Sequence, residues 1–326
     1  MKDKPARKSA LFWSLVTIGT LLVLLVVYWI GTFVYCGLNP ITCMESAGRK
    51  YLEKQGFMEH ELTHGRETIG YYDSGGTGKT MIFLHGRIFS STQFARHAFL
   101  KPFADSGYRL VLVDLPGHGL STRAGKGLSL GKLDSAITAF IREWKYKPVV
   151  LLGYGLGGWI ACRVATKNPG WFSKIVLIEP EGLKKPGRDD PPLLPDTRKQ
   201  WRNALEKAEP GTNKLKGLDY FVDDMIQRAA KIGIEKLYSS LQDDDFIMKG
   251  RIFPKVPTVV VYGSENLLNP PSRGKLFSEK LEKAVFRVVN KAGGAPFLKK
   301  PAGTAAVILD GMAALDKKKS NAEKEK

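Results

Sequence analysis

Leu151-Leu152-Gly153-Tyr154-Gly155-Leu156-Gly157-Gly158 forms the turn that decides the fold, because it joins a buried apolar run to a helical stretch ending at Lys167. Glycines allow a sharp strand-to-helix turn with close backbone packing. Such a turn has the form G-x-S-x-G where it presents a nucleophilic serine at the edge of a sheet. The middle position here is Gly155, which carries no reactive group and relieves the backbone strain typical of that position.

Short apolar runs alternate with helical stretches on both sides of this turn. They predict an α/β fold, a mostly parallel sheet with helices on both faces. The predicted strands are residues 57–64, 68–73, 81–84, 109–113, 149–152, 175–178, 258–262 and 285–289, and the predicted helices outside the turn are residues 45–55, 92–106, 128–144 and 302–315. Residues 183–250 break the alternation with prolines, charges and helical stretches near 193–208 and 218–241. This insertion predicts a helical cap over the carboxyl edge of the sheet.

Four motifs occur in an order typical of one superfamily. They are Leu84-His85-Gly86, Asp114-Leu115-Pro116-Gly117-His118-Gly119-Leu120-Ser121, the glycine-rich turn, and Val260-Val261-Tyr262-Gly263-Ser264-Glu265-Asn266. On these motifs residues 57–315 resemble the α/β-hydrolase superfamily. The phrase His85-Gly86-Arg87-Ile88-Phe89-Ser90-Ser91 and the apolar N-terminal segment resemble its single-pass α/β-hydrolase-domain-14 members, although the long insertion after Pro180 departs from them. The resemblance implies that the loop after Gly86 helps to form an oxyanion hole.

The resemblance also implies a Ser-Asp-His triad, and all three positions depart from it. Gly155 replaces the serine, Asn266 the aspartate and Gly294 the late histidine, and every histidine lies at or before His118. A triad needs a hydroxyl, a base and a carboxylate that orients the base. We therefore predict a pseudoenzyme without catalytic residues that acts by ligand binding, as a scaffold or as a complex subunit. The candidate pocket residues are His85, Gly86, Arg87, Tyr154, Gly155, Leu156, Asn266 and Gly294.

An active ester or amide hydrolase with relocated residues is the alternative. Glu179 follows a predicted strand and is a candidate for a displaced acid. His85 and His118 are candidates for a displaced base, and Tyr154 neighbours the nucleophile position. A structural role is the favoured interpretation of each residue: loop packing for His85, a turn for His118 and packing beside the glycine-rich turn for Tyr154.

Two further motifs match enzyme signatures in letters only. His60-Glu61-Leu62-Thr63-His64 has the form H-E-x-x-H, which binds zinc when it lies on a helix. Its surroundings predict a strand, on which the two histidines would lie about 13 Å apart. The segment 74–80 resembles a phosphate-binding loop but leads into a strand and has Asp73 where the first glycine belongs. We expect no metal and no cofactor, and a zinc protease is the less favoured enzyme alternative.

The N-terminal region predicts a membrane anchor. Residues 11–36 carry no charge and are long enough to span a bilayer. Aromatic residues flank this stretch, as in interfacial belts: Trp13, Tyr28, Trp29 and Tyr35. The basic segment 1–10 predicts a cytosolic N-terminus and a type II topology, and a cleaved signal peptide is the alternative. A connecting segment, 37–56, then leads to a domain over residues 57–316.

The cysteines and the net charge limit the compartment and the partners that can be expected for this protein. Cys36 and Cys43 fit either a disulfide, which requires an oxidising compartment, or two free thiols. Cys162 is predicted to lie in the core. The net charge of +18 and a basic tail over 317–326, predicted to be disordered, suit anionic lipid head groups. Expected partners are the bilayer, proteins of a membrane complex or a small apolar ligand. Nucleic acid is not expected, because no recognition motif is present.

Overall fold

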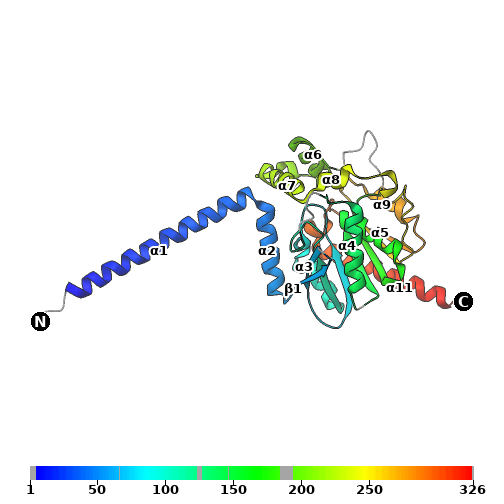
Figure 1. The fold of residues 1–326 in the computed structure, drawn as a ribbon, viewed down its shortest axis with the longest axis horizontal. Helices are drawn as coiled ribbons and strands as arrows, with labels where there is room; N and C mark the ends of the chain where they lie inside the picture. The colour runs from blue at the N-terminus through cyan, green and yellow to red at the C-terminus, as the bar shows by residue number, and fades with distance from the viewer. Residues whose placement is uncertain (1–4, 66, 123–126, 146, 184–193, 325–326) are drawn as a thin grey trace.

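A computed structural model describes residues 5–65, 67–122, 127–145, 147–183 and 194–324 of the chain (Figure 1). Its centre is an eight-stranded sheet with the spatial order β1-β2-β4-β3-β5-β6-β7-β8. The strands are β1 (Met58–His64), β2 (Glu67–Asp73), β3 (Lys79–Leu84), β4 (Tyr108–Val113), β5 (Val149–Tyr154), β6 (Phe172–Ile178), β7 (Thr258–Gly263) and β8 (Ala284–Val289). All eight predicted strands are therefore present, with small shifts at their ends.

The sheet is mostly parallel, as the alternation of apolar runs predicts. Neighbouring strands from β4 through β8 pair in parallel, whereas β2 pairs antiparallel with both β1 and β4. Adjacent side chains on a strand point to opposite faces. On β5, Leu151 joins the apolar cluster on one face and Leu152 joins the cluster on the other. Both faces are buried, which confirms the α/β fold.

Helices cover the two faces (Figure 1). Helices α4 (Leu130–Glu143) and α5 (Leu156–Lys167) contribute to the first cluster, and α3 (His97–Asp105) and α11 (Pro301–Lys324) to the second. The shorter helix α9 (Pro271–Ser278) lies beside β7 and β8, and α10 (Pro296–Lys299) packs against α11.

Two helix predictions need correction. The helix expected over residues 92–106 is divided into a short 3₁₀ turn, η1 (Ser91–Phe94), and α3, because Ala95 and Arg96 leave helical geometry. The predicted disordered tail is wrong as far as Lys324, since α11 continues to that residue. Its lysines, alanines and glutamate are good helix formers. Residues 325–326 lie outside the described chain.

The predicted insertion forms a helical cap. It contains α6 (Arg198–Ala208), α7 (Leu218–Ile232) and α8 (Ile234–Ser239). Helix α6 begins with a capping box in which Thr197 and Gln200 satisfy each other's backbone amides. Gly233, at φ 85°, ends α7 in the left-handed conformation that glycine favours. The start of the insertion, residues 184–193, lies outside the described residues.

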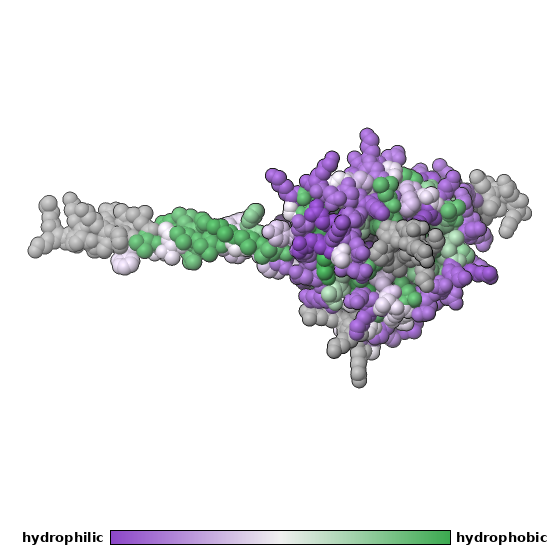
Figure 2. All heavy atoms as spheres, turned by 90° about the horizontal axis from the view of Figure 1, so that it is seen from above, coloured by the Kyte–Doolittle hydropathy of each residue, from purple (hydrophilic) through white to green (hydrophobic). Residues whose placement is uncertain are grey.

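The segment Val16–Leu38 of helix α1 (Pro5–Leu38) projects from the domain as an apolar rod (Figure 2). This segment is long and apolar enough to cross a membrane and is not buried by the rest of the protein. This agrees in position with the predicted span over residues 11–36. Lys2 and Lys4, which contribute to the predicted topology, lie outside the described residues.

Helix α2 (Pro40–Lys54) follows α1 after a single residue, Asn39. The predicted helix over residues 45–55 therefore begins earlier than expected, because Pro40 occupies the first turn, where proline suits helical geometry. A disulfide between Cys36 and Cys43, with a Cα–Cα distance of 5.6 Å, joins the end of α1 to α2. The predicted alternative of two free thiols does not occur.

The cap helix α7 holds the beginning of α2 in place. The buried carboxylate of Asp224 accepts a hydrogen bond from the Ile41 amide at 2.8 Å. Arg228 donates to Glu45 at 2.6 Å, with both side chains about one-fifth exposed. Helix α1 also contacts α7. The apolar rod, α2 and the cap are thus fixed to one another (Figure 1).

Candidate functional site

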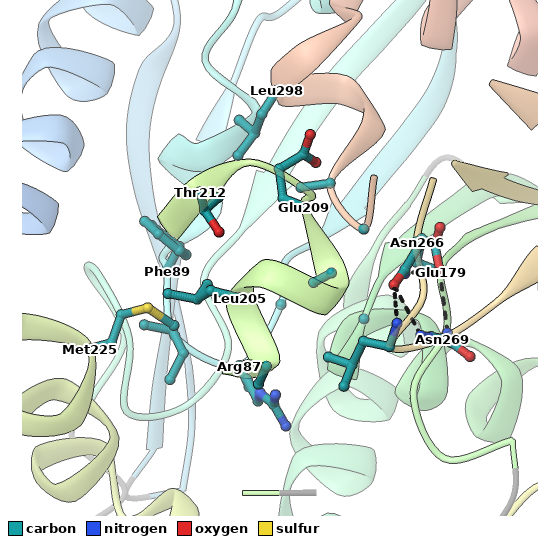
Figure 3. Close-up of a pocket in the computed structure, with 18 of the residues that line it drawn as sticks. Arg87, Phe89, Glu179, Leu205, Glu209, Thr212, Met225, Asn266, Asn269 and Leu298 are labelled. Atoms are coloured by element: carbon teal, nitrogen blue, oxygen red, sulfur yellow. Dashed lines mark hydrogen bonds between the residues drawn. The ribbon is translucent and has the colours of Figure 1, made fainter. Parts of the chain in front are cut away.

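A cavity of about 890 Å³ lies between the cap and the loops that follow the parallel strands. This volume is within the range of small-molecule sites. Figure 3 shows the side chains of Phe89, Leu205 and Met225 on one side of it. The cap also contributes the apolar side chains of Trp201, Leu218 and Phe221. The greater part of the wall on the cap side is therefore apolar.

The glycine-rich turn places Gly155 at the base of this cavity. Gly155 separates β5 from α5 and has φ 54° and ψ −118°. A residue with a Cβ adopts such geometry at a cost of about 1–3 kcal/mol. The adjacent Gly157 is required for packing, because a Cβ there would lie 2.4 Å from the carbonyl oxygen of Leu84. The backbone thus has the sharp strand-to-helix shape that the sequence predicts.

Glu181 occupies the space in front of Gly155. Its Oε1 lies 3.3 Å from the position that a Cβ on Gly155 would take. The same oxygen lies 3.7 Å from Nε of Arg87, and the hydroxyl of Tyr238 in α8 donates to the other carboxylate oxygen. Burial raises the pKa of Tyr238, and the Glu181 carboxylate raises it further. The volume that a serine side chain would enter is therefore bordered by a carboxylate with two internal partners.

Asn266 is turned toward a second carboxyl group, that of Glu179 at the end of β6 (Figure 3). Its Nδ2 donates to Oε2 of Glu179 at 2.9 Å, and the amide of Gly263 donates to Oε1 at 2.7 Å. Burial raises the pKa of Glu179 well above its ordinary value, although these two hydrogen bonds oppose the shift. Glu179 also has φ 46°, which is unusual for a non-glycine residue. Glu179 and Asn266 thus form a buried polar pair at the cavity wall.

The cap descends directly onto Gly293 and Gly294. The amide of Gly294 donates to the Ala208 carbonyl at the end of α6, at 2.7 Å. A Cβ on Gly293 would lie 2.3 Å from that same carbonyl oxygen, whereas a Cβ on Gly294 would lie 3.4 Å from Cβ of Ala208. The amide of Leu267 donates to the neighbouring carbonyl of Lys207 at 2.7 Å. Loops after β7 and β8 therefore satisfy the last carbonyls of α6, which a helix alone leaves unpaired.

The two histidines considered as displaced bases have structural partners. His85 is fully buried; its Nε2 accepts a hydrogen bond from the Leu115 amide at 2.8 Å, and its Nδ1 lies 2.7 Å from the Gly86 carbonyl. Burial lowers the pKa of His85 well below its usual value, and His118 lowers it further. The ring nitrogens of His118 face the carbonyls of Pro116 and Arg87. This geometry agrees with the favoured roles in loop packing and a turn.

The structure brings most of the candidate pocket residues together. Gly86, Arg87, Tyr154, Gly155, Asn266 and Gly294 line the cavity. His85 and Leu156 are fully buried and do not belong to its lining. Burial raises the pKa of Tyr154, and Glu179 and Glu181 raise it further. Whether these residues bind a ligand stays a prediction.

Sequence reasoning missed Glu181 and Tyr238. The sequence could have indicated Glu181, because Glu179-Pro180-Glu181 directly follows a predicted strand, and the carboxyl ends of parallel strands share one edge of the sheet. Tyr238 had no such signal. It lies on the cap, 57 residues after its partner in the chain.

The two discounted motifs take the structures that the sequence predicts. His60 and His64 lie on β1, and the His60 ring stacks on Tyr71 with centroids 5.3 Å apart. Within the described ranges, no group of three or more histidine, cysteine, aspartate or glutamate side chains is placed to hold a metal ion. The segment that resembles a phosphate-binding loop leads into β3, not into a helix.

Residues 81–307 match the model of the alpha/beta hydrolase family. Among curated proteins, the AB hydrolase superfamily protein YisY of Bacillus subtilis is 25% identical over 235 residues, which are 65% of this chain and 84% of that protein. The 1-acylglycerol-3-phosphate O-acyltransferase ABHD5 of Sus scrofa is 31% identical over 144 residues, but the match covers only 41% of this chain and 40% of that protein.

Solved structures agree in fold. A membrane phospholipase A, described as a bacterial virulence factor, superposes with a TM-score of 0.70 at 20% identity over 93% of this chain and 99% of its own. Est816, an N-acyl homoserine lactone degrading enzyme, superposes with a TM-score of 0.64 at 20% identity over 77% of this chain and 99% of its own. The family match covers well over half of the chain. The chain belongs to the alpha/beta hydrolase family.

Proposed function

We propose that this protein is a membrane-anchored, non-hydrolytic member of the family that binds an apolar ligand in the cavity beneath its cap. The arrangement at the cavity base carries the proposal. Gly155 supplies no hydroxyl, the carboxylate of Glu181 lies in front of it, and Gly294 supplies no imidazole. The cavity itself is large and mostly apolar on the cap side. Its shape depends on the scaffold and does not require a triad.

The anchor is the segment Val16–Leu38 within α1. At 1.5 Å per residue, its 23 residues extend about 34 Å, enough for the hydrocarbon core of a bilayer. We propose that the N-terminus is cytosolic and that the domain lies on the opposite side. The disulfide between Cys36 and Cys43 supports this topology, because disulfides persist in oxidising compartments.

Binding is tested with the full chain in detergent-free nanodiscs and the neutral fluorescent probe 1-N-phenylnaphthylamine. We expect saturable binding that Ala204→Phe weakens at least tenfold, because Ala204 lines the cavity and a larger side chain would fill part of it. Ala313→Phe is the matched control, since Ala313 lies exposed on α11. Equal binding by both variants, or no saturable binding by the wild type, would contradict a ligand-binding cavity.

Hydrolysis is tested separately with a fluorophosphonate probe and intact-protein mass measurement. We expect no covalent adduct, because no imidazole lies where it would activate a hydroxyl beside Gly155. An adduct on any cavity serine or threonine, or turnover of an ester that disappears in Glu179→Gln, would favour the alternative of a hydrolase with relocated residues. Saturable binding of 1-N-phenylnaphthylamine together with no fluorophosphonate adduct supports the proposal.

A further inference from the structure

The cavity touches the segment at which the chain leaves the membrane. Pro40, which lines the cavity, lies two positions after Leu38, the last residue of the apolar span. A span of this length reaches from one side of the hydrocarbon core to the other. The cavity wall at Pro40 therefore lies at the level of the lipid head groups on that side of the membrane.

The position of the cavity relative to the membrane-spanning helix α1 is fixed by covalent and hydrogen bonds. The disulfide between Cys36 and Cys43 joins the end of α1 to α2. The buried hydrogen bond from the Ile41 amide to Asp224 joins α2 to α7, a helix that supplies Phe221 and other residues to the cavity wall. Figure 1 shows α2 and α7 beside the end of α1. The cavity and the anchor thus keep one relative position.

The exposed part of the cavity rim is apolar and carries two lysines. Leu215 is 60% exposed and Leu298 is 37% exposed, and both line the cavity together with Lys216 and Lys299. Lys299 already pairs with Glu209 at 2.7 Å and with Glu265 at 3.0 Å, so Lys216 is the rim lysine that can meet an anionic group. Met44, on α2 and 40% exposed, shares a small adjoining recess with Leu298. Apolar side chains among lysines suit the interface of a bilayer that contains anionic lipids. We call Met44, Leu215, Lys216, Leu298 and Lys299 the rim.

The interior suits a hydrocarbon chain more than a charged group. Behind the rim, Phe89, Leu205 and Met225 present apolar surface (Figure 3). At the base, Arg87 and Glu181 already pair with each other. A ligand that placed only its tail inside would leave its head group hydrated beside Lys216 at the rim, which avoids the cost of burying a charge.

We propose that the rim rests on the membrane surface and that the cavity takes an anionic single-chain amphiphile, a fatty acid or lysophospholipid, directly from that bilayer with its tail inward. This inference rests on the proposed ligand-binding function. It adds the source of the ligand, its class and its orientation. Contact of the rim with a partner protein in place of lipid is an outcome that the tests below would reveal.

The position of the rim is tested by fluorescence quenching. Leu215→Cys and Leu276→Cys are each labelled with bimane in the full chain, in vesicles of phosphatidylcholine and phosphatidylglycerol containing brominated lipid. Leu276 is the matched control, because it is also 60% exposed but lies on α9, away from α1 (Figure 1). We expect at least twofold quenching at position 215 and none at 276. Equal quenching, or none at 215, would overturn the membrane contact.

Loading is tested with cis-parinaric acid supplied in the vesicles that hold the protein. We expect Leu215→Glu to slow loading at least tenfold, since a carboxylate disfavours the anionic interface, and Leu276→Glu to load like the wild type. Loading of saturated lysophospholipids from the vesicles should change little with each added methylene, because the tail passes from one apolar environment to another and is not removed from water. Equal loading by the two variants, or no loading from the vesicles, would overturn the inference.

The two proposals fail in different ways. If the wild type does not bind the neutral, lipid-unrelated probe 1-N-phenylnaphthylamine, the ligand-binding function itself fails. If that probe binds and Ala204→Phe weakens its binding, but lipid is not taken from the surrounding bilayer, only the inference about source and class fails.

Discussion

Asn266 donates its side-chain amide to Glu179 across 2.9 Å, and this pair lies at the cavity wall beside Gly294. The carboxyl group near the family's acid position therefore comes from Glu179, directly after β6, and not from the loop after β7. It faces an amide that cannot take a proton from a hydroxyl. The side-chain oxygen of Asn266, Oδ1, accepts hydrogen bonds from the backbone amides of Leu268 and Asn269 at 3.0 Å each. These bonds fix the orientation of the side chain.

Glu179→Gln should change how stability depends on pH. Burial raises the pKa of Glu179 in the folded protein well above its ordinary 4.5, so the folded state retains a proton that the unfolded state loses. The free energy of unfolding should then fall as pH rises above about 4.5, by at most about 1.4 kcal/mol per pH unit, until the folded-state pKa is passed. The variant lacks this contribution.

The measurement is chemical denaturation of both proteins from pH 4.5 to 9. Asp114 and Asp134 also have pKa values raised by burial, but both remain in the variant, so the difference between the two profiles isolates Glu179. We expect the stability of the wild type relative to Glu179→Gln to decrease with rising pH. Parallel profiles would show that Glu179 ionises alike in the folded and unfolded states.

Gly293→Ala should destabilise the protein more than Gly294→Ala. A Cβ at 293 would lie 2.2 Å from Oε2 of Glu209 and 2.3 Å from the backbone oxygen of Ala208, so the cap must move. At 294 the nearest atom is Nδ2 of Asn266 at 3.1 Å, which requires a smaller adjustment. Overpacking of this kind costs about 1–3 kcal/mol.

Thermal unfolding and hydrogen exchange of α6 give the comparison. We expect faster exchange in α6 for Gly293→Ala, because its C-terminal carbonyls lose partners in the loops after β7 and β8. Gly294→Ala should stay close to the wild type in both measurements. If the two variants behaved alike, the cap would not be docked on Gly293 as described.

Much of this architecture could be predicted from the sequence, and the reasons are local. The glycine-rich turn around Gly155 and the alternating apolar runs specify strand-to-helix turns and a two-sided sheet. The positions of Asn266 and Gly294 followed from their spacing within family motifs. Each of these features depends on neighbouring residues, which a single sequence displays.

What could not be predicted depends on the docking of the cap. The contacts from Tyr238 to Glu181 and from Ala208 to Gly294 join residues far apart in the sequence. No periodicity or motif encodes which loops the inserted helices α6, α7 and α8 contact. The link from Asp224 to Ile41, across 183 residues, is of the same kind. Long-range polar contacts were therefore visible only in the structure.

The proposed membrane topology predicts how many cysteines are free thiols. In protein purified from its native membrane and denatured without reductant, maleimide should add once, to Cys162, because Cys36 and Cys43 are paired. After reduction it should add three times, as measured by intact mass. Cys36→Ser is the control and should show two adducts under both conditions. Three adducts without reductant would place the domain in a reducing compartment.

Gly155→Ser should not create a hydrolase, although it restores the family's hydroxyl. Serine at φ 54° stores about 1–3 kcal/mol of backbone strain, so the free energy of unfolding should fall by that amount. The new side chain would also meet Oε1 of Glu181, 3.3 Å from its Cβ. An accepting carboxylate orients the hydroxyl, but without an imidazole it gives no relay for the leaving group.

Gly155→Ala separates strain from chemistry, because alanine has the same Cβ and no hydroxyl. We expect the two variants to lose similar stability in denaturant titrations, and neither to react with a fluorophosphonate over several hours. Rapid labelling of Gly155→Ser alone would mean that the carboxylate of Glu181 or Glu179 acts as an effective base at this site. The proposed absence of hydrolysis would then depend on Gly155 alone.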